Sequence, residues 1–434
     1  MTAARPRLLV VSATTGYQFR SFRTAADRLG VDLVFATDRC HQLDDPWRDG
    51  AVPIRFHDEE VAVRAIVASA AAVPLDGVVA VGDRPATIAA LAAEALGLPG
   101  HPVCAVRDAT HKLRSRVRLR DAGLAVPEFR ALPVAADEAA LLDGARFPCV
   151  VKPMALAASR GVMRADTPRQ LAAAAARLRR LLETPSVRAQ RDSANEAILI
   201  ETFVPGREVA LEGVLTDGAL RTFAIFDKPD PLDGPFFEET IYVTPDTLPP
   251  GPRGDLIAEV ERAVHALGLA HGPVHAEARI DGDRIVVLEV APRPIGGRCA
   301  RVLRFDPAAG RDGAGDWTSL EEVLVRHALG ESVDGWRVNR GSSAVMMIPV
   351  PGAGICRGVT GLDAARAVPG VDEVAITVKP GERLVPWPEG SSYPGFIFAR
   401  GKDRAAVMEA VRTAHRHLRF DIATELPVGP DGRR

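Results

Sequence analysis

Over the first hundred residues, short hydrophobic runs alternate with longer stretches in which apolar positions recur at helical spacing. The runs have the length of buried strands, and they lie at 8–13, 31–36, 52–54 and 77–81. The helical stretches lie at 19–29, 59–72 and 85–96. Strands that alternate with helices predict a parallel sheet with helices on both faces. We therefore expect a Rossmann-like open parallel sheet, an α/β domain, over residues 1–105.

Two loops follow strands of this expected sheet. The segment 12–17 (S-A-T-T-G-Y) comes after the first strand and is poorer in glycine than a dinucleotide-binding loop, and Gly82 and Asp83 come after the fourth strand. Such loops lie at the mouth of an open sheet, where ligands tend to bind. Contact with a substrate is one interpretation, and a purely structural loop is the other, which we favour.

The middle of the chain contains a basic helix and a loop suited to phosphate. The helix is expected at 106–122 and includes Lys112, which taken alone is a solvated helix lysine. A strand at 147–153 ends in Lys152, and the next loop offers a hydroxyl, a guanidinium and a flexible backbone in Ser159, Arg160 and Gly161. Such a loop can fold over phosphates and donate backbone N–H groups. A single glycine makes this a weak signal by itself.

A helix at 167–182, strands at 197–205 and 208–214, and a long loop come next. The loop at 227–245 is rich in proline and acidic residues, and a loop of this length in a compact domain is functional or disordered. Its aromatic residues argue against disorder; they are Phe236, Phe237 and Tyr242.

The sharpest pattern is a β-hairpin at 271–291. Two alternating apolar runs flank an Asp-Gly-Asp turn, which is a strong hairpin signal. If the loop centres on Asp283, Glu277 and Glu289 stand opposite each other with Cβ atoms about 5 Å apart. Facing carboxylates repel unless a cation lies between them, and an all-oxygen site suits Mg²⁺, with Mn²⁺ as a substitute. Arg293 follows at even spacing, so it should share this face. The alternative is a solvent-exposed hairpin face with ordinary charges.

Beyond the hairpin, Gly296 and Gly297 follow Arg293 and expose backbone N–H groups suited to a substrate carboxylate, with a tight turn as the alternative. Strands and helices from 343 to 418 then predict a small α+β unit. Trp387 and Tyr393 could line a pocket there, although packing is the simpler role for lone aromatic residues.

Composition limits the classes of function. The chain has 434 residues, 47% of them hydrophobic, and a formal net charge of -2, so no bulk field favours nucleic acid or an anionic membrane. No run is long and apolar enough to span a bilayer. The five cysteines are scattered without metal-ligand spacing, which indicates reduced thiols and a cytoplasmic protein.

Taken in order, these segments resemble the ATP-grasp superfamily. The ordered set is Lys112, V-V-K-P, S-R-G-V, I-E-T-F-V-P-G and the hairpin E-x-R-I…L-E-V-A-P-R. More narrowly, it is similar to the carboxylate–amine ligases of the L-amino acid ligase (dipeptide synthase) type. The resemblance implies an N-terminal Rossmann-like domain (1–105), an ATP-grasp domain of two α+β subdomains (106–200 and 201–340) and a C-terminal α+β subdomain (341–434).

The resemblance also implies roles for individual residues. Lys112 and Lys152 match the lysines that hold ATP phosphates, and Ser159 and Arg160 match the phosphate-covering loop. Glu277 and Glu289 match the metal-binding acids, and Arg293 matches the arginine that stabilises the transferred phosphoryl group. The linker strand at the adenine edge is matched by Glu201, Thr202, Phe203 and Val204, and Glu208 matches a further nucleotide-binding position. Glu239 and Tyr242 match positions near the acceptor substrate.

Two positions in the chain depart from the wider pattern. Tyr242 stands where the resemblance has a histidine, and Ala291 stands where many ATP-grasp enzymes have a metal-binding asparagine. The implied activity is ATP-dependent joining of a small amino-acid-like carboxylate to an amine through an acyl phosphate, giving an amide, ADP and phosphate. The implied ligands are ATP and Mg²⁺, and look-alikes of this type are often dimers. The alternatives are a formate- or bicarbonate-activating enzyme of the purine-pathway kind and a non-catalytic ATP-grasp-like binding protein.

Overall fold

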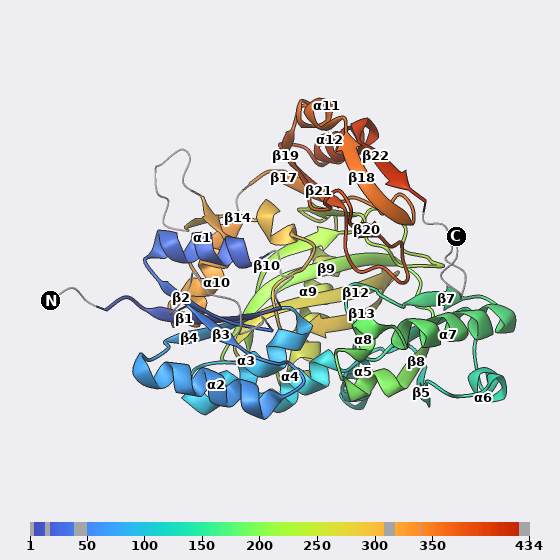
Figure 1. Cartoon of the computed structure of the whole chain (residues 1–434), viewed down its shortest axis with the longest axis horizontal. Helices are drawn as coiled ribbons and strands as arrows, with labels where there is room; N and C mark the ends of the chain where they lie inside the picture. Colours follow the sequence, from blue (N-terminus) through green and yellow to red (C-terminus); the bar gives the residue numbers. More distant parts are fainter. Residues whose placement is uncertain (1–3, 14–17, 39–49, 308–316, 339, 425–434) are drawn as a thin grey trace.

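The computed structural model describes residues 4–13, 18–38, 50–307, 317–338 and 340–424. Its N-terminal part is a parallel sheet of order β3-β2-β1-β4, as expected (Figure 1). The strands are β1 (Arg7–Ser12), β2 (Asp32–Thr37), β3 (Ala51–Pro53) and β4 (Gly77–Val81). The helices are α1 (Phe19–Leu29), α2 (Glu59–Ala72) and α3 (Asp83–Leu96). The loop at 14–17 lies outside the described residues.

Both faces of this sheet are covered because the side chains of β1 alternate between two cores. Leu9 and Val11 pack with α2 and α3, whereas Leu8 and Val10 pack with α1. Helix α10 (Leu320–Ala328), which comes much later in the chain, joins the α1 side. The N-terminal domain is thereby fixed against the rest of the molecule by a shared core.

The helix expected at 106–122 is wrong as a single element. The structure has α4 (Val103–Thr110) and α5 (Lys112–Asp121), separated by His111 in an extended conformation (φ -105°, ψ 107°). The His111 Nδ1 accepts from the Arg114 N–H at 3.4 Å and so caps α5, which is why the chain can begin a second helix there. The break places Lys112 at the start of a helix, beside the loop that follows strand β6 (Cys149–Pro153).

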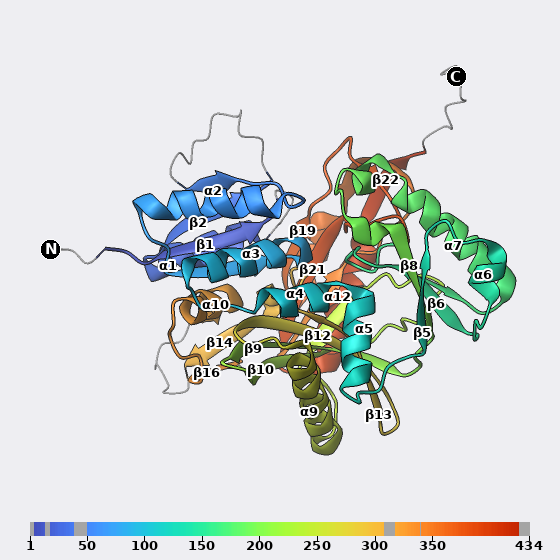
Figure 2. The same ribbon diagram turned by 90° about the horizontal axis from the view of Figure 1, so that it is seen from below.

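The small subdomain is an antiparallel sheet of order β5-β8-β6-β7 with helices on one side (Figure 2). Its helix α7 (Pro168–Leu182), expected at 167–182, begins after a Thr167 cap and buries leucines such as Leu171 and Leu178 against the sheet. The elements are β5 (Phe129–Pro133), α6 (Glu138–Leu142), β6 (Cys149–Pro153), β7 (Met163–Ala165), α7 (Pro168–Leu182), α8 (Pro185–Arg188), the 3-10 turn η1 (Ser193–Glu196) and β8 (Ala197–Thr202).

An eight-stranded sheet forms the centre, with the order β13-β12-β9-β10-β11-β17-β21-β19. One of its strands, β11 (Ile241–Thr244), lies inside the segment we expected to be a loop, and it pairs with β17. The other strands are β9 (Arg207–Thr216), β10 (Ala219–Asp227), β12 (Gly272–Asp281), β13 (Arg284–Ala291), β17 (Ser342–Met347), β19 (Val371–Ile376) and β21 (Gly395–Gly401). The sheet therefore runs across the boundary at 341, and the division into domains stays a prediction.

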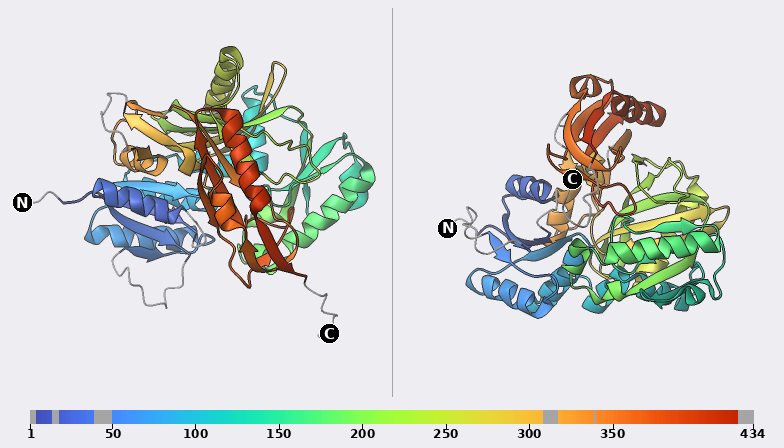
Figure 3. Two further views of the ribbon diagram at one scale, coloured as in Figure 1. Left: turned by 90° about the horizontal axis from the view of Figure 1, so that it is seen from above. Right: turned by 45° about the vertical axis from the view of Figure 1, so that its right-hand side comes forward.

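The remaining elements pack around this sheet. Helix α9 (Pro250–Leu267) covers the face that carries Val209 and Leu211, and α12 (Arg404–His417) packs on β17 and β21 (Figure 3). The smaller ones are η2 (Cys299–Val302), β14 (Arg304–Pro307), β15 (Thr318–Ser319), β16 (Trp336–Val338), β18 (Gly354–Thr360), α11 (Leu362–Arg366), β20 (Arg383–Leu384) and β22 (Arg419–Ala423). The expected α/β and α+β classes are confirmed.

Candidate active site

The β12–β13 hairpin brings Glu277 and Glu289 opposite each other, by a route that sequence spacing did not predict. Asp281 pairs with Arg284, so the turn is Gly282-Asp283 and an unbroken ladder would pair Glu277 with Leu288. A β-bulge between Glu277 and Ala278 shifts the register by one residue, and Glu277 and Glu289 become partners. The bulge therefore lets the side chains of Glu277 and Glu289 line the same cavity.

That cavity lies between the small subdomain and the central sheet, with a volume of about 120 Å³. It brings together residues from α5, β6, the loop after β6, the end of β8, β9 and the hairpin. Among its lining residues are the predicted Lys112, Lys152, Ser159, Glu201, Thr202, Phe203, Val204, Glu208, Glu277 and Glu289. Segments separated by more than a hundred residues thus converge as the ordered motifs predicted.

Lys152 and Glu201 form a buried ion pair at this cavity, and Arg116 joins them. Arg116 Nε donates to Glu201 Oε1 at 2.6 Å, and Lys152 Nζ contacts the other carboxylate oxygen. Burial lowers the pKa of Lys152 to about 8 because desolvation and the neighbouring Arg116 outweigh the attraction of Glu201. Burial alone would raise the pKa of Glu201, but the two cations hold it at about 2. A nucleotide amino group would have to compete with these two cations for the Glu201 carboxylate.

The phosphate loop, residues 157–161, is held in a tight conformation. Ala158 and Ser159 both have left-handed φ angles, 56° and 53°. Lys112 Nζ donates to the Leu156 carbonyl at 2.9 Å, just before the loop. Arg160 Nε donates to the Glu389 carbonyl at 2.9 Å, so its guanidinium points towards the C-terminal segment, away from the predicted phosphate role.

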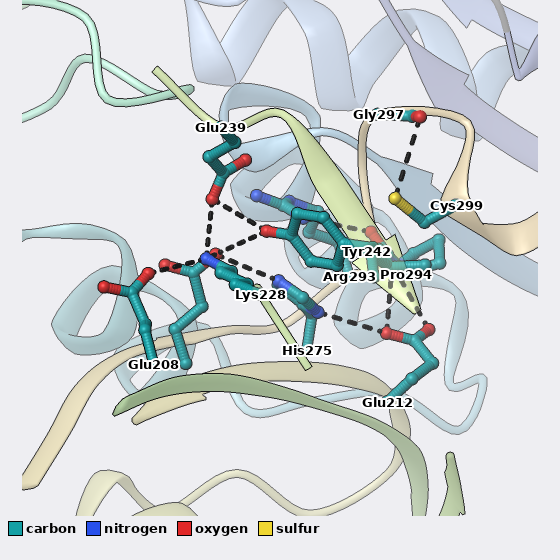
Figure 4. Close-up of polar contacts among 12 residues, drawn as sticks. Glu208, Glu212, Lys228, Glu239, Tyr242, His275, Arg293, Pro294, Gly297 and Cys299 are labelled. Atoms are coloured by element: carbon teal, nitrogen blue, oxygen red, sulfur yellow. Dashed lines mark hydrogen bonds and ion pairs between the residues drawn. The ribbon is translucent and has the colours of Figure 1, made fainter. Parts of the chain in front are cut away.

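Next to the cavity, Lys228 lies at the centre of three carboxylates (Figure 4). Its Nζ donates to Glu208 at 2.7 Å, to Glu239 at 2.6 Å and to Glu277 at 3.0 Å. Lys228 is only 2% exposed; burial opposes its charge, but the three acids raise its pKa well above the usual value. Candidate ligand atoms of Glu208, Glu239 and Glu277, the acidic triad, lie within 4.8 Å of one another. A lysine therefore supplies positive charge where sequence reasoning invoked only a metal.

Tyr242 lies in strand β11 and points into the acidic triad. Its hydroxyl donates to Glu239 Oε1 at 2.7 Å and lies 3.4 Å from Glu277 Oε1. Burial and the nearby Glu277 raise the pKa of Glu239, although Lys228 opposes the shift. Burial would also raise the pKa of Glu277, but Lys228 and His275 hold it well below its usual value. The two acids thus differ in proton affinity although both contact the same lysine.

His275 links Glu277 to a second buried acid, Glu212. Its two ring nitrogens lie 3.4 Å from Glu277 Oε1 and 3.4 Å from Glu212 Oε2. Burial lowers the pKa of an isolated histidine, but these two carboxylates raise that of His275 to about 9. Glu212 also accepts the Ile295 N–H at 3.1 Å. One N–H group of the P-I-G-G-R segment is therefore already bonded within the protein.

Arg293 is held by the N-terminal domain. Its Nε donates to Asp83 Oδ1 at 2.7 Å, and its terminal nitrogen reaches Asp83 Oδ2 at 3.4 Å. Burial lowers the arginine pKa, but Asp83 more than offsets this, and Glu289 and Glu277 add to the upward shift. The strand-end Gly82-Asp83 loop thus meets the candidate site through Arg293. Gly296 and Gly297 form the turn that follows, and a Cβ at Gly297 (φ 58°) would lie 2.5 Å from Met347 Sδ.

Sequence reasoning missed several charged members of the site. Alternation on β12 places His275, Glu277 and Arg279 on one face. This alternation could have identified His275 and Arg279 as site residues. Arg279 donates to Glu208 at 2.9 Å and to the Val204 carbonyl at 2.7 Å. No local signal marks Lys228 or Arg116, because their partners lie between 11 and 85 residues away in the sequence.

The donor set suits a divalent cation at the cavity. Glu277 and Glu289 are cross-strand partners, both line the cavity, and carboxylate oxygens are the ligands that Mg²⁺ prefers. The position of Ala291 opposite His275 leaves no oxygen donor from that side chain.

In the described residues, no helix combines the length and the apolar character that crossing a membrane requires.

Comparisons with known proteins agree with this geometry. Family models match residues 22–100 (ATP-grasp N-terminal domain), 145–302 (ATP-grasp domain) and 346–423 (L-amino acid ligase C-terminal domain 2). The solved L-amino acid ligase from Bacillus licheniformis superposes with a TM-score of 0.80 at 27% identity, over 97% of this chain and 99% of that one.

More distant similarities show how far the likeness extends. An alanine–anticapsin ligase of Bacillus amyloliquefaciens is 27% identical over 254 residues, which cover 55% of this chain and 52% of that protein. The chain thus spans about half the length of that curated relative. A phosphoribosylglycinamide synthetase from Anaerococcus prevotii has a TM-score of 0.66 at 12% identity over 97% of this chain and all of its own, a likeness in fold alone. Together with the converging motifs, these matches identify the chain as an ATP-grasp protein of the L-amino acid ligase type.

Proposed function

We propose that the protein is an ADP-forming ligase that joins a small amino-acid-like carboxylate to an amine. The observation that carries the proposal is the convergence of Lys112, Lys152, Glu277 and Glu289 on one cavity beside the acidic triad. The similarity to an L-amino acid ligase and to an alanine–anticapsin ligase supports amino-acid-like substrates.

The proposed reaction has two steps. A carboxylate is a poor acyl donor because its leaving group would be oxide. Transfer of the γ-phosphoryl group of ATP to the carboxylate oxygen breaks the bond to the β-phosphate and releases ADP. The amine then attacks the carbonyl carbon of the acyl phosphate, phosphate leaves, and the amine proton is lost. Both steps gather negative charge on phosphoryl oxygens, so preplaced cations stabilise them.

For the nucleotide, we assign Lys112, Lys152 and Ser159 to the phosphates. The segment Glu201–Val204, where β8 ends, would meet the adenine edge, with Glu208 on the adjoining strand. Glu277 and Glu289 would hold Mg²⁺, or Mn²⁺ in its place, and the ion would supply charge neutralisation at the phosphates. Arg160 would reach a phosphate only after leaving Glu389.

For the substrates, we assign Arg293 to the phosphoryl group in transfer and Glu239 to the incoming amine. Tyr242 orients Glu239 through its 2.7 Å hydrogen bond. Gly296 and Gly297 are the positions next to Arg293 where a substrate carboxylate would bind backbone N–H groups. The raised pKa of Glu239 suits an acid that accepts a proton late in the reaction.

The test is an assay of the purified chain with ATP, Mg²⁺ and pools of amino acids. We expect ADP and phosphate to accumulate only when a carboxylate and an amine are both present, with an amide of matching mass. If formate or bicarbonate alone sustains ADP release, the purine-pathway alternative is correct. If ADP never forms with any pair, the ligase proposal fails and a binding protein remains, whereas AMP would indicate an adenylate-forming mechanism.

A further inference from the structure

A segment of the C-terminal subdomain lies directly on the phosphate loop. This clamp segment, residues 385–393, connects β20 to β21. Trp387 Nε1 donates to the Ala158 carbonyl at 3.0 Å, and the Gly161 N–H donates to the Pro388 carbonyl at 2.8 Å. With the bond from Arg160 to the Glu389 carbonyl, three hydrogen bonds join the two segments. The phosphate loop is thus held from outside the subdomain that carries it.

The Glu389 side chain adds an ion pair with helix α7 of the small subdomain. Arg177 binds the carboxylate in a bidentate manner, with Nε to Oε1 at 2.5 Å and a terminal nitrogen to Oε2 at 2.7 Å. The Arg177 guanidinium also lies 4.8 Å from the ring centroid of Phe236. Phe236 in turn bridges to Met163 on β7, so the loop before β11 is fastened to the same subdomain.

The other end of the clamp segment packs against the hydrophobic core that contains Tyr242. The Trp387 ring stacks on Tyr393 with centroids 4.7 Å apart, and Tyr393 packs edge-on against Phe396. Tyr393 is partly buried, and desolvation together with the negative charge of Glu239 raises the pKa of its phenol. Contacts therefore run from the phosphate loop through Trp387 and Tyr393 to the hydrophobic core that also contains Tyr242.

We propose that the clamp segment holds the phosphate loop closed over the acyl phosphate, with Trp387 and Glu389 as positioning residues. This inference rests on the proposed ligase function. An acyl phosphate exposed to water is hydrolysed: water attacks the carbonyl carbon, the bond to the phosphate oxygen breaks, and the carboxylate and phosphate return. A lid that excludes water prevents this loss. Loss of the clamp therefore uncouples ADP formation from amide formation.

Because the ion pair between Arg177 and Glu389 is exposed, its role in loop closure can be tested apart from a role in folding. The side chains of Arg177 and Glu389 are 37% and 34% exposed, and ion pairs this accessible contribute little to folding. Variants at these positions are expected to fold, so a change in coupling reports on loop closure. Arg169 lies exposed on the same helix and provides a matched control.

The experiment measures ADP formed per amide formed in Arg177→Glu, Glu389→Arg, the double charge reversal, Trp387→Phe and the control Arg169→Glu. Each of the two single charge reversals is expected to raise the ratio about tenfold, and the double reversal to return it towards the wild-type value. Trp387→Phe keeps the stacked ring and removes one hydrogen bond, so its increase should be smaller. Hydrogen exchange at residues 157–165 should accelerate in parallel.

A wild-type ratio in all clamp variants would overturn the proposal, and so would an equal rise in Arg169→Glu. The wild-type enzyme separates this failure from that of the ligase function. If the wild type forms amide with ADP in equal amounts and the variants do too, only the clamp is wrong. If the wild type forms no amide, the underlying function has failed.

Discussion

Asp83→Asn tests whether the N-terminal domain contributes to the chemistry. Asp83 holds Arg293 through contacts of 2.7 and 3.4 Å, and the two side chains are 19% and 14% exposed. Asparagine keeps the size and one oxygen acceptor, but it removes the charge that faces the guanidinium. Arg293 is then free to turn towards Glu289 or Glu277, which also influence its pKa. We expect this loss of position to lower kcat.

The magnitude follows from two bounds. Removing one preorganised charge-stabilising group costs about 2.7–4 kcal/mol of transition-state stabilisation, the expectation for Arg293→Met. Asp83→Asn leaves the arginine in place, so about 1.4 kcal/mol, a tenfold lower kcat, is the reasoned value. Breaking a fully buried pair costs about 3–5 kcal/mol of stability, and partial exposure reduces this to about 2 kcal/mol here.

Steady-state assays and thermal unfolding of Asp83→Asn, Arg293→Met and the control Asp27→Asn check this reasoning. Asp27 is exposed on α1 and should behave as wild type in both assays. The double variant of Asp83→Asn and Arg293→Met should be no slower than Arg293→Met, since Asp83 acts through the arginine. A kcat of Asp83→Asn equal to wild type, or additive losses in the double variant, would refute the positioning role.

Three further outcomes are expected. Glu289→Gln should abolish turnover and leave the unfolding temperature unchanged, because it removes charge and not volume; an active variant would place the metal elsewhere. Since the pKa of Lys152 is about 8, nucleotide affinity should fall as pH rises through about 8 and its ammonium is lost, and Lys152→Arg should remove that dependence in calorimetric titrations. Tyr242→Phe removes a hydrogen bond that lowers the pKa of Glu239, so the acidic limb of kcat/KM should move to higher pH; an unmoved limb would contradict the assignment.

Local sequence patterns were sufficient to predict those elements whose own residues show a clear periodicity, cap or turn. The N-terminal sheet alternates strands with helices over short distances, and α7 carries both its Thr167 cap and its leucine spacing. The hairpin turn was equally plain, although the pairing of Glu277 with Glu289 depends on a bulge that no turn residue announces. A loop centred on Asp283 predicts the pairing of Glu277 with Glu289, but in the structure the bulge produces that pairing.

Strand β11 shows where local patterns are insufficient. It has four residues, Ile241–Thr244, inside a proline-rich segment. It pairs with the preceding strand β10 only at Asp227 and Val243, and its main partner β17 begins at Ser342. A strand this short is stabilised by its neighbour across the sheet, and nothing in the adjacent sequence specifies that neighbour. The same strand carries Tyr242 into the acidic triad, where its hydroxyl donates to Glu239, the other residue that the resemblance assigned to the acceptor substrate.

The acidic triad shows the same limit for charge. Sequence spacing placed Glu277 and Glu289 on one face and required a cation, and a metal was the natural choice because an all-oxygen pair suits Mg²⁺. Lys228 meets that requirement for Glu208, Glu239 and Glu277 from the end of β10. Glu277 therefore faces a lysine on one side and its partner Glu289 at the cavity on the other, and repulsion alone no longer demands a metal. The case for Mg²⁺ instead rests on the position of this pair beside Lys112 and Lys152, where phosphate charge would bind.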